Sequence, residues 1–267
     1  MTASAPADTY AFDNDDVESV DRHQFLAAML DEFTRARLSR VGDLSGARCL
    51  EIGAGGGSIA RWLGDQVGPT GRVLATDLNT RLLPEHPGYT RQQHDLTTEP
   101  VPEGPWDLIH ARLVLAHIPS RREIFGRLVE ALAPGGALVI QEWDGTPGDW
   151  AIAAPDQAAV SLLTDYQRAV GRRLQAHGLD YTWARELHGA MLAAGMVDVD
   201  TEVHARAWPG GTPGALLLTV TLDQLRDELL GEGFTAEQLD RVRELTRDPR
   251  LVWRGLLTYS TIGRRPA

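Results

Sequence analysis

Residues 49–60 read Cys-Leu-Glu-Ile-Gly-Ala-Gly-Gly-Gly-Ser-Ile-Ala, and this stretch decides the fold. The apolar run that ends at Ile52 predicts a buried parallel strand, and Ile59, Leu63 and Val67 then recur at helical spacing. The glycines between them suit a tight turn, because glycine accepts a positive φ and lets a ligand approach the backbone. The helix that follows offers unpaired N–H groups and a partial positive charge. The stretch therefore predicts a strand, a glycine turn and a helix that bind an anionic group of a ligand.

The spacing of the glycines separates two classes of cofactor. The dinucleotide fingerprint G-x-G-x-x-G would require its third glycine where this chain has Ser58. The chain instead has G-x-G-x-G from Gly53 to Gly57, with Glu51 two residues before it. The segment E-I-G-A-G-G-G-S resembles motif I of the class I S-adenosylmethionine-dependent methyltransferases. A glycine turn without a ligand is the alternative, and the downstream segments argue against it.

Two acids follow the next predicted strands. Residues 72–77 form an apolar run that ends at Asp77, whose carboxylate can accept hydrogen bonds from ribose hydroxyls in both NAD-binding and S-adenosylmethionine-binding proteins. An N-cap for the next helix is the alternative role of Asp77. Residues 89–96 predict a short strand that leads to Asp95. The resemblance implies that Asp95 accepts the adenine amino group and that the backbone of Leu96 meets a ring nitrogen, which favours the methyltransferase class.

Two further segments resemble the same family. Residues 106–117, W-D-L-I-H-A-R-L-V-L-A-H, place Ala111 and Arg112 at the end of a strand beside the expected switch point of the sheet. A guanidinium suits the methionine carboxylate, although pairing with a structural acid is the alternative for Arg112. Residues 132–142 carry the P-G-G turn typical of the family. The cofactor-binding residues implied by the resemblance are Tyr10, Glu51, Gly53, Ala54, Gly55, Gly57, Ser58, Asp77, Leu78, Asp95, Leu96, Ala111 and Arg112.

The resemblance implies one methyltransferase domain over residues 1–267, of the α/β class. We expect a Rossmann-like, doubly wound and mostly parallel seven-stranded sheet with an antiparallel last strand and helical lid insertions. The helical pattern of residues 10–41 predicts an N-terminal cap that covers the cofactor or packs on the sheet edge. Residues 145–182 predict a helical lid over the acceptor, with a core extension or a dimer contact as the alternative. Residues 214–248 predict a second helical insertion before the last strand.

The implied chemistry is displacement of the sulfonium methyl group of S-adenosyl-L-methionine, which leaves S-adenosyl-L-homocysteine. Such a reaction needs the donor and the acceptor held in line, and a general base where the nucleophile is a hydroxyl or an acidic carbon. The candidate bases are His117, Glu142 and Asp144, whereas His110 should point into the sheet. A structural role is the alternative for each of them. The candidate residues of the substrate pocket are Trp143, Trp150 and Tyr166, for which a place in the core is the alternative.

Composition restricts the partners of the chain. Its net charge of −11 argues against nucleic acid, and its lack of lysine excludes the Tyr-x-x-x-Lys site of a nicotinamide-dependent oxidoreductase. Cys49 is the single cysteine, which favours a cytoplasmic location, and no apolar run approaches the roughly 20 residues of a membrane span. We predict a small-molecule substrate of the kind used in bacterial secondary metabolism, no metal, no membrane and a possible homodimer. The competing functions are a protein that keeps the cofactor fold without methyl transfer and, less favoured, an NAD-dependent oxidoreductase.

Overall fold

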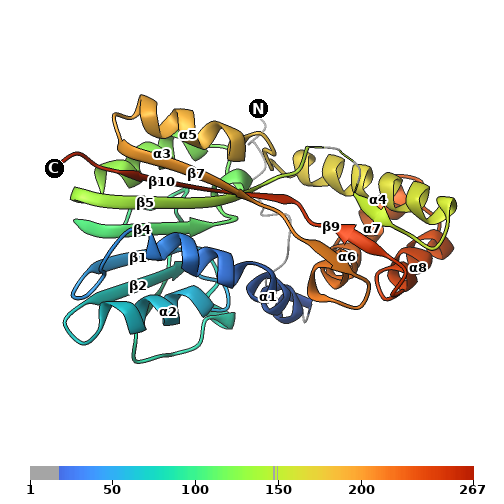
Figure 1. Cartoon of the computed structure of the whole chain (residues 1–267), viewed down its shortest axis with the longest axis horizontal. Coiled ribbons are helices and arrows are strands. Elements are labelled where there is room, and N and C mark those ends of the chain that lie inside the picture. The colour runs from blue at the N-terminus through green and yellow to red at the C-terminus, as the bar shows by residue number, and fades with distance from the viewer. Residues whose placement is uncertain (1–17, 147, 149) are drawn as a thin grey trace, which may run out of the picture.

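Seven strands form the main sheet, and all of them run parallel except β10 (Figure 1). The computed structural model describes residues 18–146, 148 and 150–267. The predicted fold class, with its antiparallel last strand, is confirmed. In spatial order the strands are β3 (Thr90–Gln93), β2 (Arg72–Asp77), β1 (Arg48–Ile52), β4 (Trp106–Arg112), β5 (Leu132–Asp144), β10 (Leu257–Arg264) and β7 (Val197–His204).

The order of the strands reverses between β1 and β4. From β1 the chain proceeds outward through β2 and β3, and it then returns to the other side of β1 as β4. Leu50 in β1 pairs with Leu74 in β2 and with Ile109 in β4, and all three side chains are buried. Ligands of open α/β sheets bind at such a switch point, beyond the carboxyl ends of the strands. The glycine turn leaves β1 at this point.

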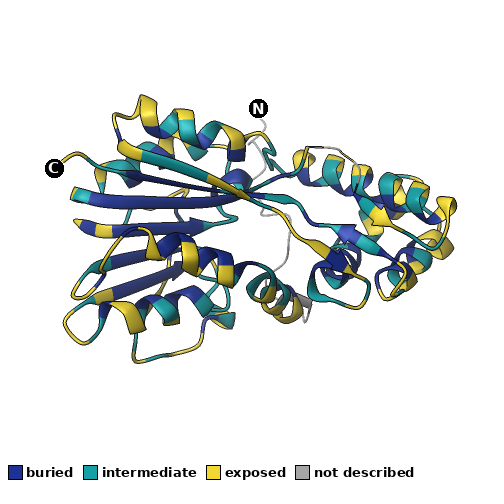
Figure 2. Ribbon diagram, in the orientation of Figure 1, coloured by how far each residue is buried: buried dark blue, intermediate teal, exposed yellow. Residues whose placement is uncertain are grey.

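Helices cover both faces of the sheet. The pairs α1/α2 and α3/α5 pack on opposite faces and enclose two separate apolar cores (Figure 2). Two short 3₁₀ turns, η1 (Thr80–Leu82) and η2 (Leu115–His117), follow β2 and β4. The four helices are α1 (Glu18–Ser39), α2 (Ser58–Val67), α3 (Arg121–Glu130) and α5 (Trp183–Ala193).

A second lobe extends from the carboxyl side of the sheet (Figure 1). It has its own apolar core, in which Trp150 stacks on Trp253 with ring centroids 5.6 Å apart. Segments that are far apart in the chain meet here, so the two helical insertions expected separately, 145–182 and 214–248, form one unit. A break at Gly255 separates β9 of this lobe from β10 of the main sheet. The elements of the lobe are β6 (Ala151–Ala153), α4 (Gln157–Ala176), β8 (Ala207–Pro209), α6 (Pro213–Gln224), α7 (Arg226–Gly231), α8 (Ala236–Leu245) and β9 (Val252–Arg254).

Helix α1 joins the two lobes. Its C-terminal half lies on the sheet, where the buried Arg37 forms ion pairs with Asp200 at 2.7 Å and Glu202 at 3.1 Å on β7. Such a buried cation needs partners, since leaving it unpaired costs several kcal/mol, about 3–5 by analogy with other proteins. Its N-terminal half packs against α6 of the second lobe. The C-terminal half of α1 thus packs on the sheet edge, one of the two roles foreseen for residues 10–41. The other role, covering the cofactor, stays a prediction.

Candidate active site

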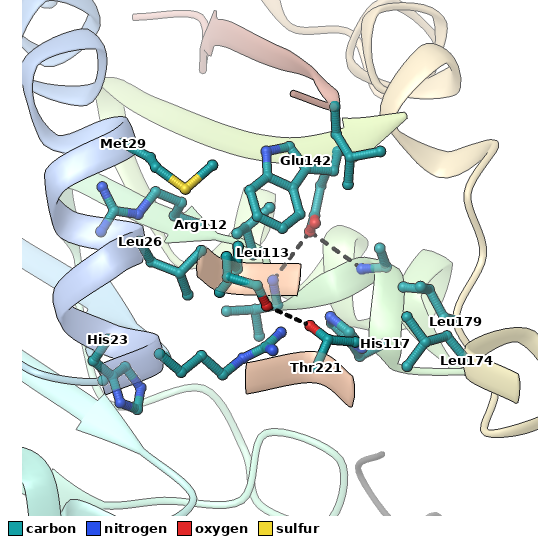
Figure 3. Close-up of a pocket in the computed structure, with 18 of the residues that line it drawn as sticks. His23, Leu26, Met29, Arg112, Leu113, His117, Glu142, Leu174, Leu179 and Thr221 are labelled. Atoms are coloured by element: carbon teal, nitrogen blue, oxygen red, sulfur yellow. Dashed lines mark hydrogen bonds between the residues drawn. The ribbon is translucent and has the colours of Figure 1, made fainter. Parts of the chain in front are cut away.

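A cavity of about 470 Å³ lies between the carboxyl edge of the sheet and the second lobe (Figure 3). One part of its wall comes from the glycine turn and from the residues that follow β2, β3 and β4. The other part comes from η2, the end of β5, α4 and α6, and is largely apolar. Helix α1 forms one side, where Figure 3 shows Leu26 and Met29 facing Leu174 and Leu179 across the cavity.

The glycine turn presents bare backbone to this cavity. Gly53 and Gly55 have φ values of 65° and 52°, in the left-handed region that favours glycine. A Cβ atom on Gly53 would lie 2.3 Å from a methyl group of Val114, and one on Gly55 would lie 2.6 Å from the ring of His23. The turn is therefore closed to larger residues, and it opens directly onto the N-terminus of α2. This geometry fits an anionic or strongly polar ligand that lies against the backbone.

Two carboxylates stand where ribose and adenine recognition was expected. Asp77 lines the cavity, and its carboxylate accepts hydrogen bonds from the backbone N–H groups of Gly55 at 2.8 Å and Asn79 at 3.0 Å. Asp95 also lines the cavity. Partial burial acts to raise the pKa of Asp95, but hydrogen bonds from Thr97 and Thr98 outweigh it and hold that pKa below its usual value. Asp95 is therefore an ionised acceptor at neutral pH.

Arg112 is held in place by helix α1. Its Nη1 donates to Asp31 Oδ1 at 3.0 Å and to Thr34 Oγ1 at 2.9 Å, and Arg112 also lines the cavity. The same Asp31 oxygen accepts a hydrogen bond from Ser58 Oγ at 3.1 Å. Arg112 thus pairs with an acid, which was the alternative considered for it, and it also lines the cavity. Its pairing with the methionine carboxylate stays a prediction. Asp31 links α1 to the end of β4 and to the glycine turn.

Among the described residues, Glu142 supplies the carboxyl group on the apolar side of the cavity. Its side chain is 1% exposed, and Oε1 accepts the backbone N–H groups of Val114 at 3.3 Å and Ala116 at 3.1 Å (Figure 3). Burial raises the pKa of Glu142 to about 8, although these hydrogen bonds and Arg121 favour the charged form. Glu142 can therefore exchange a proton near neutral pH.

His117 faces the same cavity from η2, in the neutral form. Burial is the main reason that the pKa of His117 falls to about 3, and the positive charges of Arg22 and Arg121 lower it further. A histidine with such a low pKa holds no proton at physiological pH and is a weak base. Of the candidate bases, Glu142 is the better suited to accept a proton in this site.

Several residues assigned from the sequence lie outside the cavity lining. Glu51 is buried and bonds to His110 Nδ1 at 2.7 Å, so it serves the sheet, and His110 points into the sheet as predicted. Gly57 caps α2, where a Cβ would meet Leu83, and Ala111 is fully buried in β4. Tyr10 lies outside the described residues.

The candidate base Asp144 and the candidate pocket residue Tyr166 also lie outside the cavity lining, which corrects both assignments. Asp144, the last residue of β5, accepts hydrogen bonds from the backbone and hydroxyl of Thr146 and is not among the lining residues. Tyr166 is buried in the core of the second lobe, where its hydroxyl donates to Leu218 O at 2.7 Å. Trp143 and Trp150 do line the cavity. The assigned residues in the lining are Gly53, Ala54, Gly55, Ser58, Asp77, Leu78, Asp95, Leu96, Arg112, His117, Glu142, Trp143 and Trp150.

Sequence reasoning did not name the individual lining residues of α1 and α6, although a cap over the cofactor was one of the two roles expected for residues 10–41. Helix α1 supplies Arg22, His23 and Met29 to the lining, and α6 supplies Leu217 and Thr221. Their helical periodicity indicated only that these segments pack against something, and no motif marks them as part of a site.

Comparison with known proteins agrees with this geometry. Residues 21–201 match the family model of the methyltransferase domain. Methyltransferase str2 of Strobilurus tenacellus is 31% identical over 161 residues, which cover 60% of this chain and 55% of that protein. Trans-aconitate 2-methyltransferase of Variovorax paradoxus is 34% identical over 119 residues, which cover 42% of this chain and 45% of that protein. The chain spans about half the length of the curated relatives it matches.

Solved structures share the fold at low sequence identity. The phosphoethanolamine N-methyltransferase 2 of Haemonchus contortus, solved with phosphomonomethylethanolamine and S-adenosylhomocysteine, superposes with a TM-score of 0.54. The two are 18% identical, and the match covers 88% of this chain and 53% of that one.

The sheet order, the glycine turn and its flanking carboxylates define a nucleotide-binding α/β protein of the class I methyltransferase type. The chain belongs to the S-adenosylmethionine-dependent methyltransferases, as the match over residues 21–201 shows. The cofactor of this family is S-adenosyl-L-methionine, and the bare turn, Asp77, Asp95 and Arg112 fit its polar groups. Within the described part of the chain, no helix is both long and apolar enough to cross a membrane.

Proposed function

We propose that this protein transfers a methyl group from S-adenosyl-L-methionine to a hydroxyl oxygen or an acidic carbon of a small, largely apolar molecule, of the kind made in secondary metabolism. One observation carries the proposal: Glu142, with a pKa near 8, lies on the apolar side of a cavity whose other side is the glycine turn. A carboxyl group in such a position can accept the proton that the nucleophile must lose.

In this proposal, some residues of the cavity bind the cofactor and the acceptor, and Glu142 transfers the proton. The cofactor, when bound, supplies a methyl group that its sulfonium already activates. The glycine turn, Asp77 and Asp95 would hold the nucleoside, and Arg112 would hold the carboxylate. The apolar wall orients the acceptor and excludes water, so that proximity provides much of the acceleration. Glu142 takes the proton from the acceptor and later releases it to solvent.

Mass spectrometry with isotopically labelled S-adenosylmethionine and a panel of phenols, amines and carboxylates tests this function. We expect labelled products from phenols or enols, because these nucleophiles need a base, whereas an amine needs only to be neutral. Products confined to amines or carboxylates would contradict the role of Glu142. Tight binding of the cofactor without any product would favour the alternative, a protein that keeps the fold for another reaction.

We also propose that the second lobe acts as a lid together with the N-terminal part of the chain. The cavity lies between the lobes, and α4 and α6 form its apolar wall, so ordering of this wall would enclose the acceptor. Hydrogen exchange should show that residues 145–182 gain protection when cofactor and acceptor bind. A segment that is already as protected as β1 and β4 without ligand, or that does not change, would contradict the lid.

A further inference from the structure

We infer that Tyr181 and Gln167 form a second polar subsite in the acceptor pocket, which binds an oxygen of the acceptor remote from the atom that receives the methyl group. This inference rests on the proposed function, because it names the class of acceptor for the same pocket. The ligand is an apolar, ring-bearing molecule with two oxygen functions, one at Glu142 and one at Tyr181.

The hydroxyl of Tyr181 has no partner in the described part of the chain. Tyr181 lies between α4 and α5 and lines the cavity. No described residue donates a hydrogen bond to its hydroxyl or accepts one from it, and burial is the only cause that raises its pKa. Tyr166 provides the contrast, since its hydroxyl donates to a backbone carbonyl in the core. Partly buried hydroxyls usually have a partner, so an available one that faces a cavity points to a ligand.

The ring of Tyr181 is held by two glycines that also line the cavity. A Cβ atom on Gly145, directly after β5, would lie 1.9 Å from Cδ1 of the ring, so the ring packs closely against the backbone there. A Cβ atom on Gly171, within α4, would lie 3.9 Å from the Tyr181 hydroxyl oxygen. The hydroxyl therefore has a defined position beside α4. Glycine weakens a helix interior, and at position 171 its lack of a side chain leaves this part of the cavity open.

Gln167 adds a second polar group to the same wall. It lies one helical turn before Gly171 on α4, so the two residues share a face of the helix. Gln167 lines the cavity, and its side chain makes no hydrogen bond to any described residue. A hydroxyl and an amide that line one cavity can together donate to and accept from a hydroxyl or carbonyl group.

The surroundings of these groups define the rest of the ligand. The stacked pair Trp150 and Trp253 lines the cavity, together with Val170 and Leu174 of α4. Indole and aliphatic side chains in the lining favour an apolar ring system over a flexible polar chain. A ring system with one oxygen at each end satisfies both Glu142 and the Tyr181 subsite.

The test compares binding of 2-naphthol with that of the dihydroxynaphthalene isomers, measured by calorimetry on protein saturated with S-adenosylhomocysteine. At least one diol should bind the wild type about 3- to 10-fold more tightly than 2-naphthol, which is the usual effect of one added hydrogen bond. Tyr181→Phe should abolish this advantage and leave the affinity for 2-naphthol and for S-adenosylhomocysteine unchanged. The matched control Tyr166→Phe, which removes a hydroxyl from the core, should keep the advantage.

Each other outcome overturns the inference. If Tyr181→Phe keeps the preference for the diol, or if no diol is preferred by the wild type, the subsite does not exist. If none of these probes binds, the pocket does not take ring systems. Methyl transfer to the same probes is measured separately. A preference for the diol that depends on Tyr181, without any methylated product, would retain the subsite and refute the proposed transfer. Methylation at a rate that does not depend on Tyr181 would support the transfer and refute the subsite.

Discussion

Glu142→Gln is expected to lower kcat by about 10²- to 10⁴-fold, the usual contribution of a positioned general base. The substitution keeps the size of the side chain and an oxygen that can accept the N–H groups of Val114 and Ala116. The fold and the affinity for S-adenosylhomocysteine should therefore remain. Steady-state kinetics with any accepted phenol, together with calorimetry, measures both effects. Asp144→Asn, two residues further along the chain and outside the cavity lining, is the matched control and should leave kcat unchanged.

The pH dependence of the wild type tests the same assignment. Burial raises the pKa of Glu142 from 4.5 to about 8, so kcat/KM should rise with pH and level off above this value. The folded protein holds this proton more tightly than the unfolded chain does. The stabilisation that results is complete below the unfolded pKa and is lost as pH rises through about 8. The wild type should lose this part of its stability as pH rises from about 4.5 to about 8, and Glu142→Gln should not. If kcat/KM and Tm depend on pH in the same way in the wild type and in Glu142→Gln, Glu142 is not the titrating base.

The sequence was informative where the chemistry is local. A strand, a glycine turn and a helix follow one another within 20 residues, and each acid follows its strand directly, so Gly53, Asp77 and Asp95 could be placed in the site before the structure. Parallel strands end at one edge of a sheet, which is why these separate segments meet. The fold class followed from the same local signals.

The second lobe could not be predicted in this way. Its core joins Trp150, directly before β6, with Leu163 of α4, Leu222 of α6 and Trp253 of β9. Each segment by itself shows only an apolar stripe, and such a stripe does not indicate which other segment it packs against. The tyrosines Tyr166 and Tyr181 illustrate the limit: both are aromatic residues in or beside α4, yet one bonds to the core and the other faces the cavity. Tertiary packing alone decides between the two positions.

Arg112→Met is expected to weaken the binding of S-adenosylhomocysteine by at least about 30-fold, because losing one partner of a buried, hydrogen-bonded ion pair costs roughly 2–5 kcal/mol. Arg112 is 14% exposed and lines the cavity at the end of β4, where its free edge can take the ligand carboxylate. Methionine keeps much of the length of the arginine stem and removes the charge. Calorimetry measures the affinity, and thermal unfolding without ligand shows how much the fold itself has lost. An unchanged affinity would mean that Arg112 serves only as the partner of Asp31.

Asp31 should act through Arg112 rather than on the ligand, since it holds Nη1 of that guanidinium and does not line the cavity. Asp31→Asn should therefore weaken binding by a smaller factor, roughly the 3- to 10-fold effect of one hydrogen bond. Added to Arg112→Met, the same substitution should have almost no further effect, because residues that share one interaction are not additive. Arg35→Met is the matched control: Arg35 also pairs with Asp31, at 3.4 Å, but its side chain is 46% exposed and lies outside the cavity. If the losses from Arg112 and Asp31 add in full, helix α1 does not orient the guanidinium, and the two residues act independently.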